Sequence, residues 1–148
     1  MDLEKLSDND VSKLIQEVKY YFEKFTLNIP LIINKYKKDI KVKGYSSNLE
    51  YIFHAYCGRI ETRYSLHIRF KETHTHLVRL CINGSRHKNS DGTELGPNHI
   101  HIYRFNGSEP EAYAYPLDNY DFDATDSLES AINKFIEFVN IQFEGSDT

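Results

Sequence analysis

The chain has 148 residues, of which 40% are hydrophobic and 14% aromatic, and this composition predicts a folded globular protein. Its length favours a single domain over residues 1–148. The formal net charge of −4 and the isoelectric point near 6.0 exclude a generally basic surface, so attraction to phosphate must come from one local face.

The N-terminal part of the chain predicts two helices. Ser7 and Asp10 form a capping-box pattern, and hydrophobic residues follow at helical spacing, which predicts a helix over residues 7–27. Pro30 suits a first helical turn, so a second, short helix is expected over residues 28–39. No segment here resembles a signal peptide or a membrane span, and the expected location is the cytoplasm.

Three segments then alternate between hydrophobic and polar side chains, as β-strands do when one face is buried. They cover residues 49–57, 61–70 and 76–83. In the third segment, the alternation assigns His76 to the buried side and Leu77 to the opposite, polar side.

Bringing the hydrophobic sides together predicts the register of these strands. A loop over residues 71–75 places His67 opposite Arg79. A tighter loop over residues 58–61 closes the preceding hairpin. The pairs expected across that hairpin are Phe53 with Leu66, His54 with Ser65, and Glu50 with Arg69.

Two more strands are expected over residues 98–105 and 111–115, joined by a turn around residues 106–110. This hairpin places Tyr103 opposite Tyr113 and His101 opposite Tyr115. The side chains predicted to share the polar face are His99, His101, Tyr103, Tyr113 and Tyr115.

The connection over residues 84–97 is long for a compact domain, and such loops are often functional. Asp91–Gly92 predicts a turn within it. Arg86, His87 and Lys88 are adjacent and basic, which makes the connection a candidate rim for a binding site. The alternative is a hairpin that projects into solvent and has no part in a binding site.

The C-terminal segment predicts a helix that begins near Asp126, with Glu129 in its first turn, and carries hydrophobic residues to Val139. The expected fold class is α+β, with an antiparallel sheet of about five strands and the N- and C-terminal helices packed on one face. Cys57 and Cys81 lack the close spacing of a metal motif and are expected to be reduced, buried thiols.

Two runs carry a resemblance to a known family. They are His87-Lys88-Asn89-Ser90-Asp91-Gly92-Thr93 and Asn98-His99-Ile100-His101-Ile102-Tyr103-Arg104, and Tyr113–Leu117 extends them. The pattern resembles an uncharacterised family of small bacterial and phage proteins, catalogued as a domain of unknown function. Ser90 stands where proline is expected. The resemblance covers residues 75–140 best, implies a phage, prophage or mobile-element setting, and transfers no catalytic residue.

Three kinds of chemistry suit the polar face. The first is metal binding, because His99 and His101 lie on one side of a strand and His54 and His67 approach from neighbouring strands. The His-x-His spacing is a weak signal and has no evident carboxylate companion. Neither a metal nor another cofactor is therefore predicted.

The second is metal-independent cleavage of RNA, which needs a general base, a general acid and cations that stabilise the phosphorane. The residues predicted to catalyse it are His99, His101, His67 and Tyr103. Arg69 and Arg79 are predicted to hold the phosphate.

The third is binding without catalysis, either of single-stranded RNA or of a protein partner. The residues predicted to bind are Arg69, Arg79, Arg86, His87, Lys88, Tyr113, Tyr115 and His54. Nucleic-acid handling is the preferred prediction, with ribonuclease activity as one form of it. The alternative is an anti-CRISPR-like inhibitor of a host defence protein or nucleoprotein, in which the acidic run Asp118–Asp126 imitates phosphates. The sequence leaves enzyme and binding protein as open alternatives.

Overall fold

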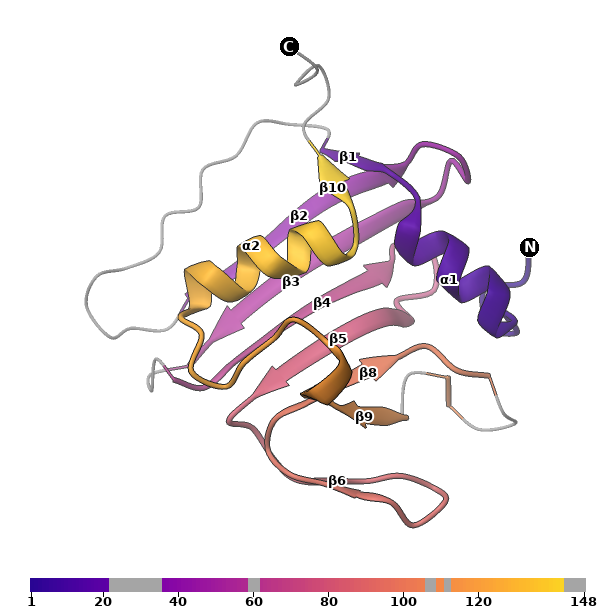
Figure 1. Ribbon diagram of the computed structural model, residues 1–148. Coiled ribbons are helices and arrows are strands. Elements are labelled where there is room, and N and C mark those ends of the chain that lie inside the picture. Colours follow the sequence, from indigo (N-terminus) through magenta and orange to yellow (C-terminus); the bar gives the residue numbers. More distant parts are fainter. Residues whose placement is uncertain (22–35, 59–61, 106–108, 111–112, 143–148) are drawn as a thin grey trace.

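The structure is a computed structural model and describes residues 1–21, 36–58, 62–105, 109–110 and 113–142. Within these residues, helices α1 (Asp8–Gln16) and α2 (Leu128–Phe138) lie on one face of an eight-stranded sheet (Figure 1). In sheet order, the strands are β10 (Ile141–Gln142), β1 (Lys19–Tyr21), β2 (Tyr36–Gly44), β3 (Glu50–Cys57), β4 (Tyr64–Phe70), β5 (His76–Ile82), β8 (His99–Ile102) and β9 (Ala114–Pro116).

The α+β class and the antiparallel character of the sheet are confirmed, although the sheet has eight strands rather than about five. The β1–β10 pair is parallel, and every other neighbouring pair in this sheet is antiparallel. Strands β1, β2 and β10 account for the difference, because they lie outside the segments that alternation predicted as strands. A short 3₁₀ helix (Leu117–Asn119) follows β9.

The first predicted helix begins where expected but ends early. Ser7 Oγ accepts a hydrogen bond from the Asp10 amide at 3.1 Å, and the Asp10 carboxylate accepts one from the Ser7 amide at 3.4 Å, which completes the capping box. The backbone becomes extended at Glu17, so α1 ends at Gln16 and the chain continues as β1. Residues 22–27 of this prediction lie outside the described residues.

The second predicted helix is wrong where the structure describes it. Residues 36–39 belong to β2, in which Ile40 and Val42 are buried while the lysines between and beside them are not. Residues 28–35 lie outside the described residues. In α2, the N-cap is Ser127 rather than Asp126, because Ser127 Oγ accepts from the Ser130 amide at 3.1 Å.

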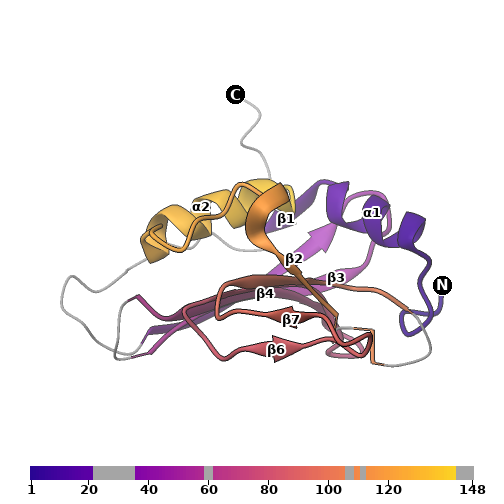
Figure 2. The same ribbon diagram turned by 60° about the horizontal axis from the view of Figure 1, so that its bottom comes forward.

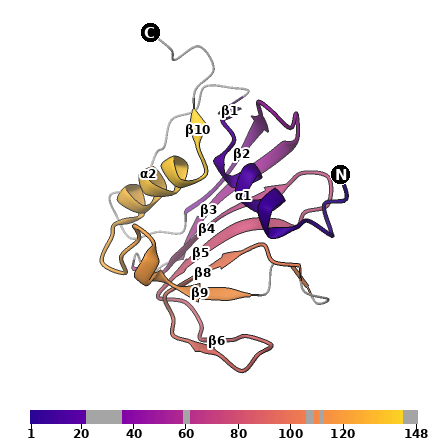
Figure 3. The ribbon, with the colours of Figure 1, turned by 45° about the vertical axis from the view of Figure 1, so that its right-hand side comes forward.

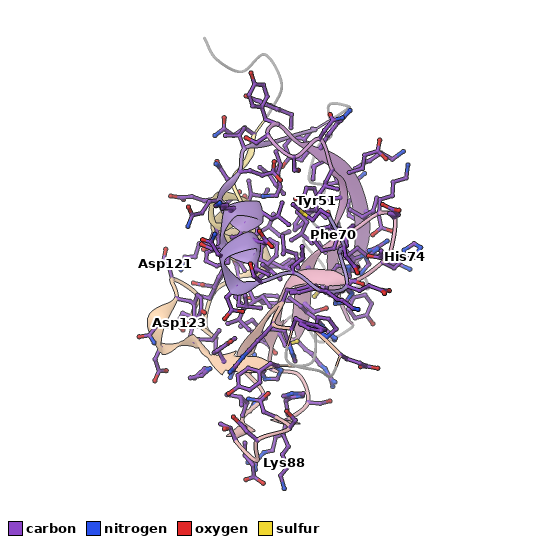
Figure 4. All side chains as sticks on the ribbon, turned by 90° about the vertical axis from the view of Figure 1, so that its right-hand side faces the viewer. Tyr51, Phe70, His74, Lys88, Asp121 and Asp123 are labelled. Atoms are coloured by element: carbon purple, nitrogen blue, oxygen red, sulfur yellow. The ribbon has the colours of Figure 1, made fainter. Side chains whose placement is uncertain are left out.

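The core lies between the two helices and the sheet. Tyr51, Phe53 and Phe70 are fully buried on the helix side of β3 and β4, and the Phe53 ring stacks on Phe135 of α2. Figure 4 shows Tyr51 and Phe70 directed into this layer. The predicted faces of these two strands are therefore confirmed.

Within the described residues, no helix combines the length and apolarity needed to cross a membrane.

The register is confirmed in one hairpin and wrong in the other. His67 pairs with Arg79 as predicted. In the β3–β4 hairpin, however, His54 pairs with His67, Phe53 with Ile68 and Ile52 with Arg69. The turn is longer than expected, because the strands end at Cys57 and begin again at Tyr64. The error is two residues, so every side chain keeps its predicted face.

A β-bulge in β5 reverses the predicted sides of two residues. Ile68 pairs with Val78, but Arg69 pairs with His76, which leaves Leu77 as an extra residue. Leu77 is fully buried in the core, and His76 lies on the opposite face of the sheet.

The connection between β5 and β8 forms a second, two-stranded hairpin of β6 (His87–Lys88) and β7 (Glu94–Leu95). Its predicted turn is confirmed at Gly92, whose φ of 92° suits glycine. Asn89 is buried and exchanges two hydrogen bonds with the Ala114 backbone, at 2.8 and 2.9 Å, which fix the hairpin to β9. The hairpin lies on the opposite side of the sheet from α1 and α2 (Figure 2).

Candidate functional site

The sheet face opposite the helices, here called the outer face, carries a row of charged and imidazole side chains across five neighbouring strands. Successive cross-strand partners in this row are Asp39, His54, His67, Arg79 and His101. The row exists because each strand places one polar residue at the same level while its neighbours along the chain point into the core. Figure 3 shows the strands that carry it, from β2 to β8.

Three histidines form a stack on this face. The His67 ring lies between those of His54 and His76, with centroid distances of 4.7 and 4.1 Å. His54 Nδ1 lies 2.5 Å from an Asp39 carboxylate oxygen, and Arg69 donates a hydrogen bond to His67 Nε2 at 2.8 Å. Because arginine can only donate, His67 Nε2 must carry a lone pair, and the ring is neutral.

The environment of His67 opposes its protonation. Burial is the main cause that lowers its pKa to about 2, and the positive charges of His76, His54, Arg69 and Arg79 add to the effect. His67 is therefore neutral at physiological pH, whereas the role of general acid in RNA cleavage requires a protonated ring.

This depressed pKa makes the protein less stable in acid. Below about pH 6.5 the unfolded chain takes up a proton on His67, whereas the folded chain does so only near pH 2. Between these two pH values, each unit of acidification lowers the free energy of unfolding by up to about 1.4 kcal/mol. His67→Gln keeps an acceptor for Arg69 but does not titrate. Urea unfolding between about pH 6.5 and 4 is expected to show a flatter pH dependence for this variant. The exposed His74→Asn serves as control, and equal slopes for both variants and the wild type would contradict the assignment.

A pocket of about 520 Å³ opens beside this stack, between the sheet and the β5–β6 connection. Its lining residues are Tyr56, Arg63, Tyr64, Ser65, His76, Arg79, Cys81, Gly84, Ser85, Arg86, His87, His99, His101 and Glu109. Three of these are arginines, four are histidines and one is acidic. The pocket therefore presents an unusual concentration of positive and neutral nitrogen donors in an acidic protein.

The wall of the pocket contains a Cys–His cluster, which consists of Cys81, His87, His99 and His101. Cys81 and His99 are cross-strand partners on β5 and β8, and His101 lies two residues along β8 on the same face. All three are buried, because the β6–β7 hairpin folds beside them and brings the His87 ring to 4.9 Å from His101 and 5.8 Å from His99. Burial raises the pKa of the Cys81 thiol, and Arg79 opposes this shift.

The predicted catalytic residues divide between the two faces. His99 and His101 share the outer face, as alternation predicted, and both line the pocket. Tyr103 does not: it is buried in the core, where its hydroxyl donates to the Leu3 carbonyl at 2.7 Å. Strand β8 ends at Ile102, so alternation no longer determines the side of Tyr103.

Tyr113 and Tyr115, which were predicted to share the polar face, also lie elsewhere. His101 pairs with Ala114 and Ile100 with Tyr115, and this one-residue difference moves Tyr115 to the helix side, against the core. Tyr113 precedes the strand, and its hydroxyl donates to an Asp91 carboxylate oxygen at 2.9 Å while Arg104 lies 4.4 Å from its ring centroid.

The remaining predicted binding residues do not all lie at the pocket. Arg79, Arg86 and His87 line it, whereas His54 and Arg69 belong to the adjacent histidine stack. Lys88 is exposed on β6, at the far end of the molecule from β10 (Figure 4).

Sequence reasoning missed several residues of the pocket. Arg63 and Tyr56 line it but were not proposed, and Cys81 was considered only as a structural thiol. Alternation along β5 puts Cys81 on the same face as Arg79, but only the β5–β8 pairing brings Cys81 to His99.

A family model described as a family of unknown function (DUF6978) matches residues 6–141. The chain belongs to this family. The match runs from the α1 cap into β10, so it includes the whole outer-face pocket. Membership of a family of unknown function is what the sequence resemblance predicted. No curated protein and no solved structure matches the chain.

Proposed function

We propose that the outer-face pocket binds single-stranded RNA. The observation that carries this proposal is the convergence of Arg63, Arg79 and Arg86 on one pocket, with Glu109 as its acidic residue. Guanidinium groups bind phosphate through paired hydrogen bonds, and three of them around one concavity suit a phosphodiester backbone.

The distribution of charge supports the proposal. Outward positions of β2 to β5 carry five basic residues, Lys37, Lys41, Lys43, Arg69 and Arg79, against two acidic ones, Asp39 and Glu50. The difference of +3 contrasts with a net charge of −4 for the chain. Asp121 and Asp123 lie on the helix side (Figure 4). The outer face is therefore the local basic surface that the composition requires.

The other lining residues suit nucleotides that are not paired. The half-buried Tyr56 offers a ring surface on which an unpaired base can stack. The volume of about 520 Å³ is in the range of pockets that hold small ligands, which fits unpaired nucleotides better than a duplex. Imidazole nitrogens can also hydrogen-bond the 2′-hydroxyl that distinguishes RNA from DNA.

These placements favour binding over cleavage. Of the four side chains predicted for a metal-independent ribonuclease, Tyr103 lies in the core and His67 is neutral. The remaining two, His99 and His101, lie together with a thiol in a buried cluster. The proposal is therefore binding alone, and cleavage of the bound RNA would be a separate result of the binding experiment.

The double variant Arg63→Gln, Arg86→Gln tests the proposal. Both residues are exposed at the pocket, so the fold should be unaffected, while two phosphate contacts are lost. Titration of a fluorescent single-stranded RNA, followed by anisotropy, is expected to show an affinity lowered by about tenfold or more. The dependence of log K on log salt should become shallower by roughly one or two units.

The matched control removes a positive charge from the opposite face. Lys13→Gln is exposed on α1 and should bind RNA like the wild type. Equal losses in the control and the double variant would mean that only net charge matters. Absence of RNA binding by the wild type, together with a stoichiometric protein partner captured from the host cytoplasm, would overturn the proposal in favour of a protein inhibitor.

A further inference from the structure

The Cys–His cluster has the donor set of a transition-metal site. One potential ligand atom from each of Cys81, His99 and His101 lies within 4.8 Å of the other two, and all three residues are buried. Thiolate and imidazole are the characteristic ligands of Zn²⁺, whereas Mg²⁺ and Ca²⁺ prefer oxygen.

The backbone holds these donors in place. Cys81 and His99 face each other across the β5–β8 ladder, and His101 follows on the same face, so the three side chains project from rigid strands. His99 Nδ1 donates to the Gly96 carbonyl at 2.8 Å, which leaves its Nε2 with the lone pair. A backbone carbonyl in this role is the usual outer partner of a metal-bound histidine.

His87 provides a fourth donor from the hairpin. Its ring centroid lies 4.9 Å from that of His101. Among the residues that the structure describes, no hydrogen-bond partner reaches His87 Nε2, although this atom is buried. A buried imidazole nitrogen without a partner is unfavourable, and a metal ligand bond would satisfy it.

We propose that Cys81, His99, His101 and His87 bind one Zn²⁺ in a tetrahedral site. Bond lengths of about 2.0–2.3 Å place tetrahedral ligand atoms about 3.3–3.7 Å apart, so the donor atoms of Cys81, His99 and His101 must approach one another by roughly 1 Å. Small side-chain rotations cover that distance, and a rotation of the His87 side chain must bring its Nε2 to the same point from the hairpin. The site does not depend on RNA binding, because none of the pocket arginines is a ligand.

Four protein ligands leave no open position, which is the pattern of a structural zinc site. The ion would join β5 and β8 to the β6–β7 hairpin and thereby fix one wall of the pocket. The ion would act together with the Asn89 hydrogen bonds to the Ala114 backbone, which also hold the hairpin to the sheet.

The test loads the purified full chain with Co²⁺ and Zn²⁺ in turn. One equivalent of Co²⁺ is expected to give the near-ultraviolet charge-transfer band of a cobalt–thiolate bond, and Zn²⁺ should displace it. Cys81→Ser should lose the band, while Cys57→Ala, which removes the other buried thiol, should retain it. Circular dichroism of each variant verifies that it is folded.

The histidine ligands are tested by zinc affinity in competition with a chelator. His99→Ala and His87→Ala should each weaken binding by at least about tenfold, and the exposed His74→Asn should not. A folded wild type without the thiolate band, or a band that Cys81→Ser retains, would overturn the proposal. An unchanged zinc affinity in His87→Ala would show that His87 is not a ligand and would overturn the proposed four-ligand site.

Discussion

Replacing Lys19 with methionine is expected to lower the free energy of unfolding by about 3–5 kcal/mol. Lys19 has no exposed surface, and the three N–H donors of its ammonium group are shared among four backbone carbonyls within hydrogen-bond distance. The acceptors are those of Leu14 at 2.6 Å, Ile15 at 3.0 Å, Glu17 at 3.0 Å and Val139 at 2.8 Å. Methionine keeps the length of the side chain but leaves these buried carbonyls without a donor.

The size of the effect follows from where these carbonyls lie. Leu14, Ile15 and Glu17 are at the C-terminal end of α1, and Val139 is the C-cap of α2, so one cation satisfies the ends of both helices. Burial lowers the pKa of Lys19 to about 8, with Glu17 opposing the shift, and the side chain therefore remains charged at pH 7.

Urea denaturation of Lys19→Met beside Lys13→Met measures this contribution. Lys13 is exposed on α1, so its variant should change stability by less than about 0.5 kcal/mol. If the Lys19 variant lost less than about 1 kcal/mol, the carbonyls would have another donor and the ammonium would not join the helices.

Leu66→Ala is expected to cost about 2–5 kcal/mol, because it opens a cavity in the centre of the core. Leu66 is fully buried on β4, and its cross-strand neighbours, Ala55 and Leu80, are also fully buried. None of these lies at the edge of the sheet, so the backbone has little freedom to close the space.

Ser65→Ala is the matched control for this change. Ser65 is adjacent on β4 and faces the outer pocket, so its truncation creates no core cavity. Chemical denaturation should separate the two variants clearly. A loss below about 1 kcal/mol for Leu66→Ala would mean that the faces of β4 are reversed.

Much of the sheet was predictable because alternation is a local signal. It assigned β3 and β4 to the correct faces even where the hairpin register was wrong by two residues. Strand β1 was missed because hydrophobic spacing continued past Gln16, whereas the backbone becomes extended at Glu17 and β1 pairs with β2 and β10, which no local pattern reveals. The β5 bulge at Leu77 is likewise a product of pairing between strands.

The site was predictable only in part, because alternation is local whereas the site depends on how distant strands pair. His99 and His101 followed from alternation, but His76 reached the outer face through the bulge. Cys81 joins His99 only through pairing of strands separated by the long connection, and His87 arrives only when that connection folds back as a hairpin.

The most direct test of the central claim, that the outer-face pocket binds RNA, is a nuclear magnetic resonance titration of the isotopically labelled chain with a single-stranded RNA. At 17.4 kDa, the protein is small enough for residue-specific assignment. We expect the resonances of Ser65, Arg79 and Cys81 to shift progressively, while those of exposed residues on α1 and α2 stay in place. Shifts confined to the helix side, or none at saturating RNA, would contradict the proposed site.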